Sequence, residues 1–131
     1  MEEKWTEYKN IVIPEGVYEI TEVIQNFEGT KITLESDTFK IVILFEFADS
    51  VRISDEGRRI KTYQECKELQ TYRKNFNGNP IYVVEKSLFK KWMIEESVGI
   101  YTESTHYAVV TKNDIVDVLS YQEPIINIYK N

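Results

Sequence analysis

The feature that most constrains the fold is an unbroken alternation of large apolar side chains in residues 39–47. Every second residue from Phe39 to Phe47 is a phenylalanine or an isoleucine. This period of two is typical of a β-strand, whose successive side chains point to opposite faces of a sheet. Because Val42 and Leu44 on the other face are apolar as well, we expect the strand to be central and covered on both faces.

Further strands are predicted by segments rich in β-branched and aromatic residues. We expect them over residues 17–27, 31–35, 51–53, 81–84, 106–111 and 124–129. The first four strands of the chain are joined by short polar turns, which indicates an antiparallel meander. Pro124 places the last strand at a sheet edge, where a missing N–H is tolerated. Residues 115–119 fit either a strand or a single helical turn.

Two segments show helical spacing instead. Thr62 and Glu65 match a capping box and predict a helix over residues 63–72. Ser87 is expected to cap a second helix, with Gly99 as its C′ residue. The predicted buried positions of the two helices are Tyr63, Cys66, Leu69 and Tyr72 in the first, and Leu88, Phe89, Trp92 and Met93 in the second.

This order of elements predicts an α+β fold, in which a curved antiparallel sheet packs on one or two helices. The chain has 131 residues, no evident linker and no internal repeat. We therefore expect a single domain over residues 1–131.

Charge and cysteine content exclude several classes of protein. The formal net charge is −6, whereas nucleic-acid binders are usually basic, so we expect no nucleic-acid partner. A single cysteine, Cys66, permits neither an intramolecular disulfide nor a thiolate metal cluster. Neither phosphate-loop pattern is present, and we expect no cofactor. The acidic N-terminus and the shortness of the apolar stretch 41–48 favour a cytoplasmic protein that makes no contact with a membrane.

Candidate catalytic residues are few. His106 is the only histidine, and it would suit a general base paired with Tyr107 or with a carboxylate on a neighbouring strand. A buried strand residue packed beside Tyr107 is the alternative interpretation. The charged segment Asp55–Lys61 would suit either an anion site or a solvated turn.

Acidic and aromatic residues point toward protein binding. The 22 acidic residues would provide either a hydrolase carboxylate pair, plain solubility, or a surface that attracts a basic partner. The nine tyrosines suit half-buried strands and also binding hot spots.

Three segments together resemble a known family. They are Asp55–Arg59, then Phe89–Trp92 followed by Glu95, Glu96, Ser97 and Gly99, and finally His106–Ser120. In this order they are similar to small cytoplasmic proteins of Bacillus-like Firmicutes, some of which look like immunity partners of polymorphic toxins. The resemblance spans roughly residues 17 to 124 and carries over no catalytic residue.

Size, acidity and this resemblance predict a non-enzymatic protein-binding module that neutralises a basic toxin domain. The expected contact residues are Trp92, Glu95, Glu96 and Tyr101, because they lie on or beside the second helix, although Trp92 also fits the core. The alternative is a small enzyme or ligand-binding domain with a pocket at His106 and Tyr107. A third hypothesis is a homo-oligomer formed through edge strands such as residues 125–129.

Overall fold

The computed structural model describes residues 3–131, which form nine strands, three α-helices and one 3₁₀ turn. The strands are β1 (Lys4–Glu7), β2 (Glu19–Asn26), β3 (Gly29–Glu35), β4 (Phe39–Phe45), β5 (Ala48–Asp55), β6 (Ile81–Glu85), β7 (Thr105–Val110), β8 (Asp114–Ser120) and β9 (Ile125–Lys130). The helices are α1 (Ile60–Glu65), α2 (Lys67–Arg73) and α3 (Leu88–Glu96), and the 3₁₀ turn is η1 (Glu56–Arg58).

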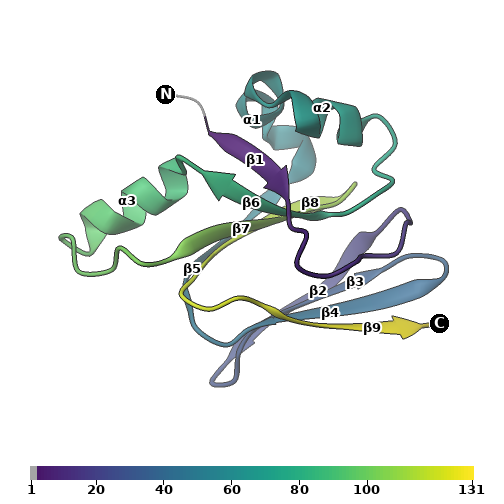
Figure 1. Cartoon of the computed structure of the whole chain (residues 1–131), viewed down its shortest axis with the longest axis horizontal. Helices are drawn as coiled ribbons and strands as arrows, with labels where there is room; N and C mark the ends of the chain where they lie inside the picture. The colour runs from purple at the N-terminus through teal and green to yellow at the C-terminus, as the bar shows by residue number, and fades with distance from the viewer. Residues whose placement is uncertain (1–2) are drawn as a thin grey trace.

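The strands form two antiparallel sheets. One sheet has five strands in the order β1-β6-β7-β8-β5, and the other has four in the order β2-β3-β4-β9. Figure 1 shows three layers, with α1 and α2 above the five-stranded sheet and the four-stranded sheet below it. The α+β class is therefore confirmed, but the single curved sheet that we expected is two sheets.

The chain passes between the sheets three times. Residues 8–18 connect β1 to β2, and two further connections lie next to each other. Residues 46–47 connect β4 to β5, and residues 121–124 connect β8 to β9. The predicted meander is confirmed for β2, β3 and β4, whereas β5 leaves it and pairs with β8. The alternation that begins at Phe39 correspondingly ends at Phe45, and Phe47 is exposed. Short-range turns could not predict this, because the partner of β5 lies about sixty residues further along the chain.

The first core fills the space between the two sheets. Alternate residues of β3 and β4 face alternate residues of β7 and β8, and all of these side chains are buried. β7 and β8 are covered on both faces, because their other faces lie beneath the helices. The expectation that β4 is covered on both faces is wrong. Val42 and Leu44 are only partly buried, since their face of the four-stranded sheet is the outer one (Figure 1).

The second core lies between the five-stranded sheet and α1 and α2. The four predicted positions Tyr63, Cys66, Leu69 and Tyr72 are all buried there, together with Trp5 of β1 and Tyr82 of β6. The predicted helix 63–72 is two helices, separated by an extended residue at Cys66. The Gln70 amide donates to the Tyr63 carbonyl oxygen over 2.6 Å, and so satisfies a carbonyl freed at the end of α1.

The predicted capping box is wrong. α1 begins at Ile60, with Arg59 as its N-cap residue and no side-chain cap. The Thr62 hydroxyl instead accepts a hydrogen bond from Arg59 Nε over 3.3 Å. Thr62 lies inside the first turn of α1 and therefore cannot be its N-cap residue.

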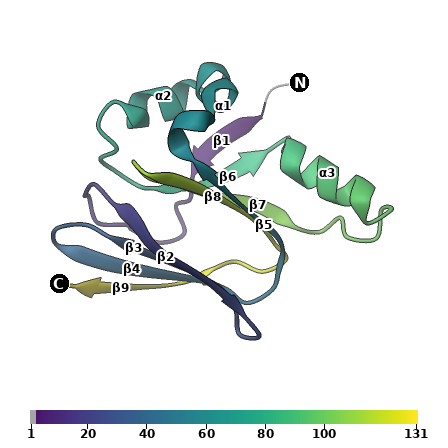
Figure 2. The same ribbon diagram turned by 180° about the vertical axis from the view of Figure 1, so that it is seen from behind.

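The predicted cap of α3 is confirmed, since the Ser87 hydroxyl accepts from the Lys90 N–H over 2.9 Å. The prediction for Gly99 is wrong by one position. Ser97 is the C-cap residue, so Val98 occupies C′ and adopts a positive φ of 48°. Gly99 follows with φ 80°, and its N–H donates to the Ile94 carbonyl. α3 extends beside the five-stranded sheet (Figure 2). Of its four predicted buried positions only Phe89 is buried, Met93 is partly buried, and the prediction is wrong for Leu88 and Trp92, which are 47% and 49% exposed because α3 does not lie over the face of the sheet.

The end of the chain follows the predictions closely. Residues 115–119 are a strand within β8, and β9 is an edge strand of the four-stranded sheet. β1 was not predicted.

Within residues 3–131 no helix is long and apolar enough to cross a membrane.

Candidate functional site

A buried ionisable network lies at the centre of the five-stranded sheet. Asp117 of β8 has a solvent exposure of 0%, and His106 of the adjacent β7 has 1%. In the register of these strands, Asp117 pairs with Ala108 and His106 pairs with Leu119. The aspartate and the histidine are therefore diagonal neighbours on one face, close enough for direct contact between their long side chains.

The contact continues from Asp117 through His106 to Ser87. His106 Nε2 lies 2.8 Å from Asp117 Oδ1, and His106 Nδ1 lies 2.6 Å from the Ser87 hydroxyl. A carboxylate only accepts hydrogen bonds, so we assign the ring hydrogen to Nε2. The Ser87 hydroxyl then donates to Nδ1 while it accepts the N–H of Lys90. Every polar atom of the chain Ser87–His106–Asp117 is satisfied in this assignment.

Two arginines bind the second oxygen of Asp117. Arg59 Nη1 lies 2.7 Å from Asp117 Oδ2, and Arg52 Nε lies 2.9 Å from the same atom. Arg52 is directly opposite Asp117 in the pairing of β5 with β8. Arg59 reaches the carboxylate from the start of α1 and has a side-chain exposure of 13%, against 40% for Arg52. Arg59 is thus the more buried partner.

These partners hold Asp117 in its ionised form. Burial by itself raises the pKa of a carboxyl group, because it disfavours the charged form. The hydrogen bond that His106 donates and the charges of Arg59 and Arg52 outweigh burial and lower the pKa of Asp117 to about 2. Asp117 is therefore an anion throughout the neutral pH range.

Aromatic rings close the network off from solvent. Trp5 and Phe89 approach the His106 ring edge-on, with centroid distances of 5.9 and 5.5 Å. The Arg52 guanidinium covers the Phe89 ring at 4.4 Å. His106 lines none of five cavities that open on the surface of residues 3–131.

Serine, histidine and aspartate are also the residue types of hydrolase triads. In the serine-protease arrangement, however, the serine bonds Nε2 and the aspartate bonds Nδ1, whereas both contacts are reversed here. Both nitrogens of His106 already have partners, and the Ser87 hydroxyl caps α3. In this conformation the network joins β5, β7 and β8 to the starts of α1 and α3, and its histidine and aspartate are both buried.

The other predicted residues are dispersed. Tyr107 points away from His106 into the core between the sheets, where it contacts Tyr8 and Phe45 at centroid distances of 5.8 and 5.4 Å. Arg58 and Lys61 are exposed, whereas Arg59 of the same charged segment turns inward. The structure thus joins His106 to a cross-strand carboxylate but separates it from Tyr107.

The four predicted contact residues are all exposed on or just after α3. Trp92 is 49% exposed and stacks on Phe89 with an angle of 13° between the rings. Glu95 and Glu96 are exposed at the end of the helix, and Tyr101 is exposed in the segment that follows. These positions are accessible to a partner without any rearrangement of the core.

Exposed apolar side chains gather around the same helix and form what we call the α3 surface. Its members are Phe47, Leu88, Trp92, Ile100, Tyr101 and Tyr121. Leu88 and Trp92 line a hollow of about 460 Å³ against β5. The other four line a second hollow of about 340 Å³. Both hollows reach β5, since Asp49 lines one and Ser50 lines the other.

Acidic side chains border this surface. Asp49 and Glu103 line the second hollow, and Glu95 and Glu96 lie at the end of α3. Arg52 lines the first hollow, but its charge is paired with Asp117. Within residues 3–131 no group of three or more histidine, cysteine, aspartate or glutamate side chains is arranged to hold a metal ion.

Sequence reasoning missed the roles of Ser87, Arg52 and Arg59 in the buried network. Asp117 was considered only as one of many carboxylates. Its position was a usable signal, since it is the one charged residue in the apolar run Ile115–Leu119, and a buried charge requires a partner. The identity of that partner depended on the strand order, which the sequence does not reveal.

Comparison of the chain with protein-family models, with curated proteins and with solved structures found no match. The resemblance to small Firmicutes proteins of the immunity type therefore stays a prediction.

Proposed function

We propose that this chain is a non-enzymatic protein-binding module of the bacterial cytoplasm, and that it neutralises a basic toxin domain held against the α3 surface. The observation that carries the proposal is the gathering of exposed aromatic and aliphatic side chains on and after α3. Single exposed apolar residues are ordinary, but a continuous apolar patch typically marks an interaction site.

The chemistry of the α3 surface favours a protein partner. Trp92 and Tyr101 are of the residue types that most often dominate binding energy. Trp92 rests on Phe89, which is itself buried, so its ring is presented in a defined orientation and loses little entropy on binding. The two hollows beside β5 would accept apolar side chains of the partner.

Charge favours a basic partner. The chain carries a net charge of −6, and Asp49, Glu95, Glu96 and Glu103 border the apolar patch. A basic domain would approach such a surface faster than a neutral one, and the effect would weaken with salt. Many toxin domains that act on nucleic acids carry a basic cleft, which an acidic neutraliser complements.

We do not extend the proposal to catalysis at His106. Both of its ring nitrogens are engaged by protein groups, and 1% of the residue is exposed. A general base needs a free nitrogen within hydrogen-bond reach of the reacting proton.

The test is capture of a partner by tagged protein from a lysate of the source organism, followed by affinity measurement with purified components. We expect one stoichiometric basic protein domain whose toxicity the chain suppresses. Trp92→Ala should weaken its binding about tenfold or more. Replacing Glu95 and Glu96 with lysine should slow association most strongly at low salt.

Phe27→Ser is the matched control, because Phe27 is 97% exposed in the β2–β3 turn and loses a comparable apolar side chain outside the α3 surface. It should leave the affinity unchanged. Capture of an acidic partner, equal losses in Phe27→Ser and Trp92→Ala, or no protection against the captured domain would each refute the proposal.

A further inference from the structure

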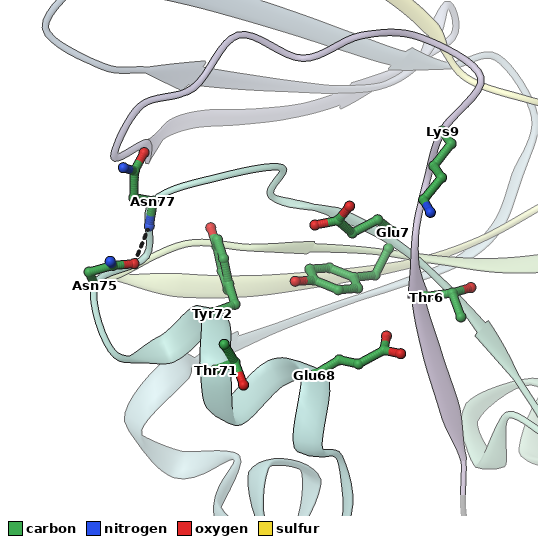
Figure 3. A pocket seen from close by; sticks show the side chains of 9 residues that line it. Thr6, Glu7, Lys9, Glu68, Thr71, Tyr72, Asn75 and Asn77 are labelled. Carbon is green, nitrogen blue, oxygen red and sulfur yellow. Dashed lines mark hydrogen bonds between the residues drawn. The ribbon is translucent and has the colours of Figure 1, made fainter.

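A polar cavity opens between β1, α2 and β6. Its volume is about 550 Å³. We call it the β1–α2 cavity, and it is lined by Glu7, Glu68, Tyr82, Tyr72, Asn77 and Lys9, among other residues. Figure 3 shows the side chain of Glu7 extending from β1 toward α2, while that of Glu68 extends from α2 toward β1. The cavity shares no lining residue with the α3 surface.

Tyr82 is a buried residue with an unused polar group in this cavity. It is only 2% exposed, and its ring packs against Trp5 and Tyr72 at centroid distances of 6.3 and 5.9 Å. The Tyr72 hydroxyl donates to the Val110 carbonyl over 2.7 Å, whereas within residues 3–131 the Tyr82 hydroxyl makes no hydrogen bond to protein. Tyr82 lines the cavity, and its hydroxyl is not among the buried polar atoms that lack a partner. The hydroxyl therefore reaches the open space of the cavity, where it is available to a ligand.

The two carboxylates are also uncommitted. Within residues 3–131 neither Glu7 nor Glu68 forms an ion pair, although Lys9 lines the same cavity. Burial raises the pKa of Tyr82, and the negative charges of Glu7 and Glu68 raise it further. Both carboxylates line the same cavity as the phenol. Two anions and a hydroxyl thus border one space that, among residues 3–131, holds a single cationic side chain, Lys9, and Lys9 forms no ion pair with either anion.

We propose that the β1–α2 cavity binds an organic cation, namely a guanidinium or primary ammonium group on a short aliphatic chain. The cation lies between Glu7 and Glu68, and one of its N–H groups donates to the Tyr82 hydroxyl. Guanidinium in particular has a fork of donors that matches carboxylates. The aliphatic chain runs toward Tyr72 and Asn77 at the other end of the cavity.

A metal ion suits the cavity less well. Calcium takes at least six oxygen ligands and magnesium needs near-octahedral geometry, whereas only two carboxylates line the cavity, and within residues 3–131 no group of three or more histidine, cysteine, aspartate or glutamate side chains is arranged to hold a metal ion. The cation could be a free small amine or the side chain of an arginine or lysine in a peptide. This inference does not rest on the protein-binding proposal, since the two sites lie on different elements.

The test is calorimetric titration of the full chain with agmatine, with N-acetyl-arginine methylamide, and with butylurea as a neutral analogue. We expect a cation to bind and butylurea not to bind. Tighter binding of agmatine would identify a free amine as the ligand, and equal or tighter binding of the capped arginine would identify a peptide side chain.

The variants Glu7→Gln and Glu68→Gln should each weaken cation binding about tenfold or more, because each removes a charge-assisted hydrogen bond. Tyr82→Phe should weaken it several-fold while leaving the unfolding midpoint unchanged, since the hydroxyl has no protein partner to lose. Glu28→Gln makes the same charge change in the β2–β3 turn, outside the cavity, and should bind like the unaltered chain.

Three results would overturn the inference. They are failure of both cations to bind at millimolar concentration, equal binding of butylurea, and equal losses in Glu28→Gln and the two cavity variants. Circular dichroism of each variant separates a lost site from a lost fold.

Discussion

Replacing Asp117 with asparagine removes the negative charge of the buried network while keeping the size of the side chain. The asparagine oxygen can still accept from an arginine, and its amide can face His106 Nε2 if the ring hydrogen moves to Nδ1. Arg59, whose side chain is 13% exposed, then loses its counter-charge without gaining access to water. Removing one partner of a buried ion pair lowers the free energy of unfolding by about 3 to 5 kcal/mol. We expect Asp117→Asn near the lower end of this range, because the asparagine amide can still form hydrogen bonds with an arginine and with His106.

We therefore expect Asp117→Asn to lower the free energy of unfolding by about 3 kcal/mol at neutral pH. For 131 residues this corresponds to a fall in Tm of about 10 °C. Urea titration followed by tryptophan fluorescence and circular dichroism measures the first quantity, and calorimetry measures the second. Asp114→Asn is the matched control, because Asp114 begins the same strand but makes no side-chain contact with the network. It should change stability by no more than about 0.5 kcal/mol.

A double-mutant cycle locates the effect. Combined with Arg59→Gln, Asp117→Asn should show a coupling free energy of about 1 to 3 kcal/mol. Combined with Arg52→Gln, the coupling should be below about 1 kcal/mol, because Arg52 is 40% exposed and solvent screens its charge. Equal destabilisation by Asp114→Asn and Asp117→Asn, or a stronger coupling to Arg52 than to Arg59, would refute this account of the network.

Three further predictions concern pH, capping and backbone conformation. The pKa of Asp117 lies at about 2 in the fold and near 3.8 when unfolded, so about 2 kcal/mol of stability should be present above pH 4 and lost as the pH falls toward 2. Urea midpoints measured from pH 5 to pH 2 should show this fall, and Asp117→Asn should abolish most of it. Ser87→Ala should cost about 1 to 2 kcal/mol and speed amide exchange first in α3, whereas uniform acceleration along the chain would contradict a local cap. Gly29→Ala should destabilise the fold more than Gly99→Ala. Both glycines have a positive φ, but only an alanine Cβ at position 29 would clash with a carbonyl oxygen of β4. Thermal unfolding of the two variants measures the difference.

Local sequence patterns predicted most elements because strands and helices bury side chains at different periods. The run from Phe39 to Phe45 and the short strands near the C-terminus needed no tertiary information. The Ser87 cap was visible for the same reason, since its hydroxyl acts on an N–H three residues away. β1 was missed because four residues, of which only Trp5 is buried, are too few to establish a period.

The candidate sites were predictable only in part. Spacing assigned Glu95 and Glu96 to the polar face of a helix, and both are exposed there. Spacing assigned Trp92 to the buried face, whereas it is 49% exposed. The β1–α2 cavity could not be found, because Glu7, Glu68 and Tyr82 lie on three elements that meet only through the pairing of β1 with β6 and the packing of α2 over them.

The sequence by itself determined the α+β class, the positions of most strands and the buried face that α1 and α2 present. The tertiary structure alone decided that there are two sheets, that β5 joins β8, and that Arg52, Arg59 and His106 converge on Asp117. The physical reason is the distance along the chain over which each effect acts. Side-chain periodicity acts over a few residues, whereas the partner of a strand depends on the burial of whole faces by segments far apart in the chain. An isolated Asp117 in an apolar strand would be unstable in any other arrangement, so the buried charge and the strand order require each other.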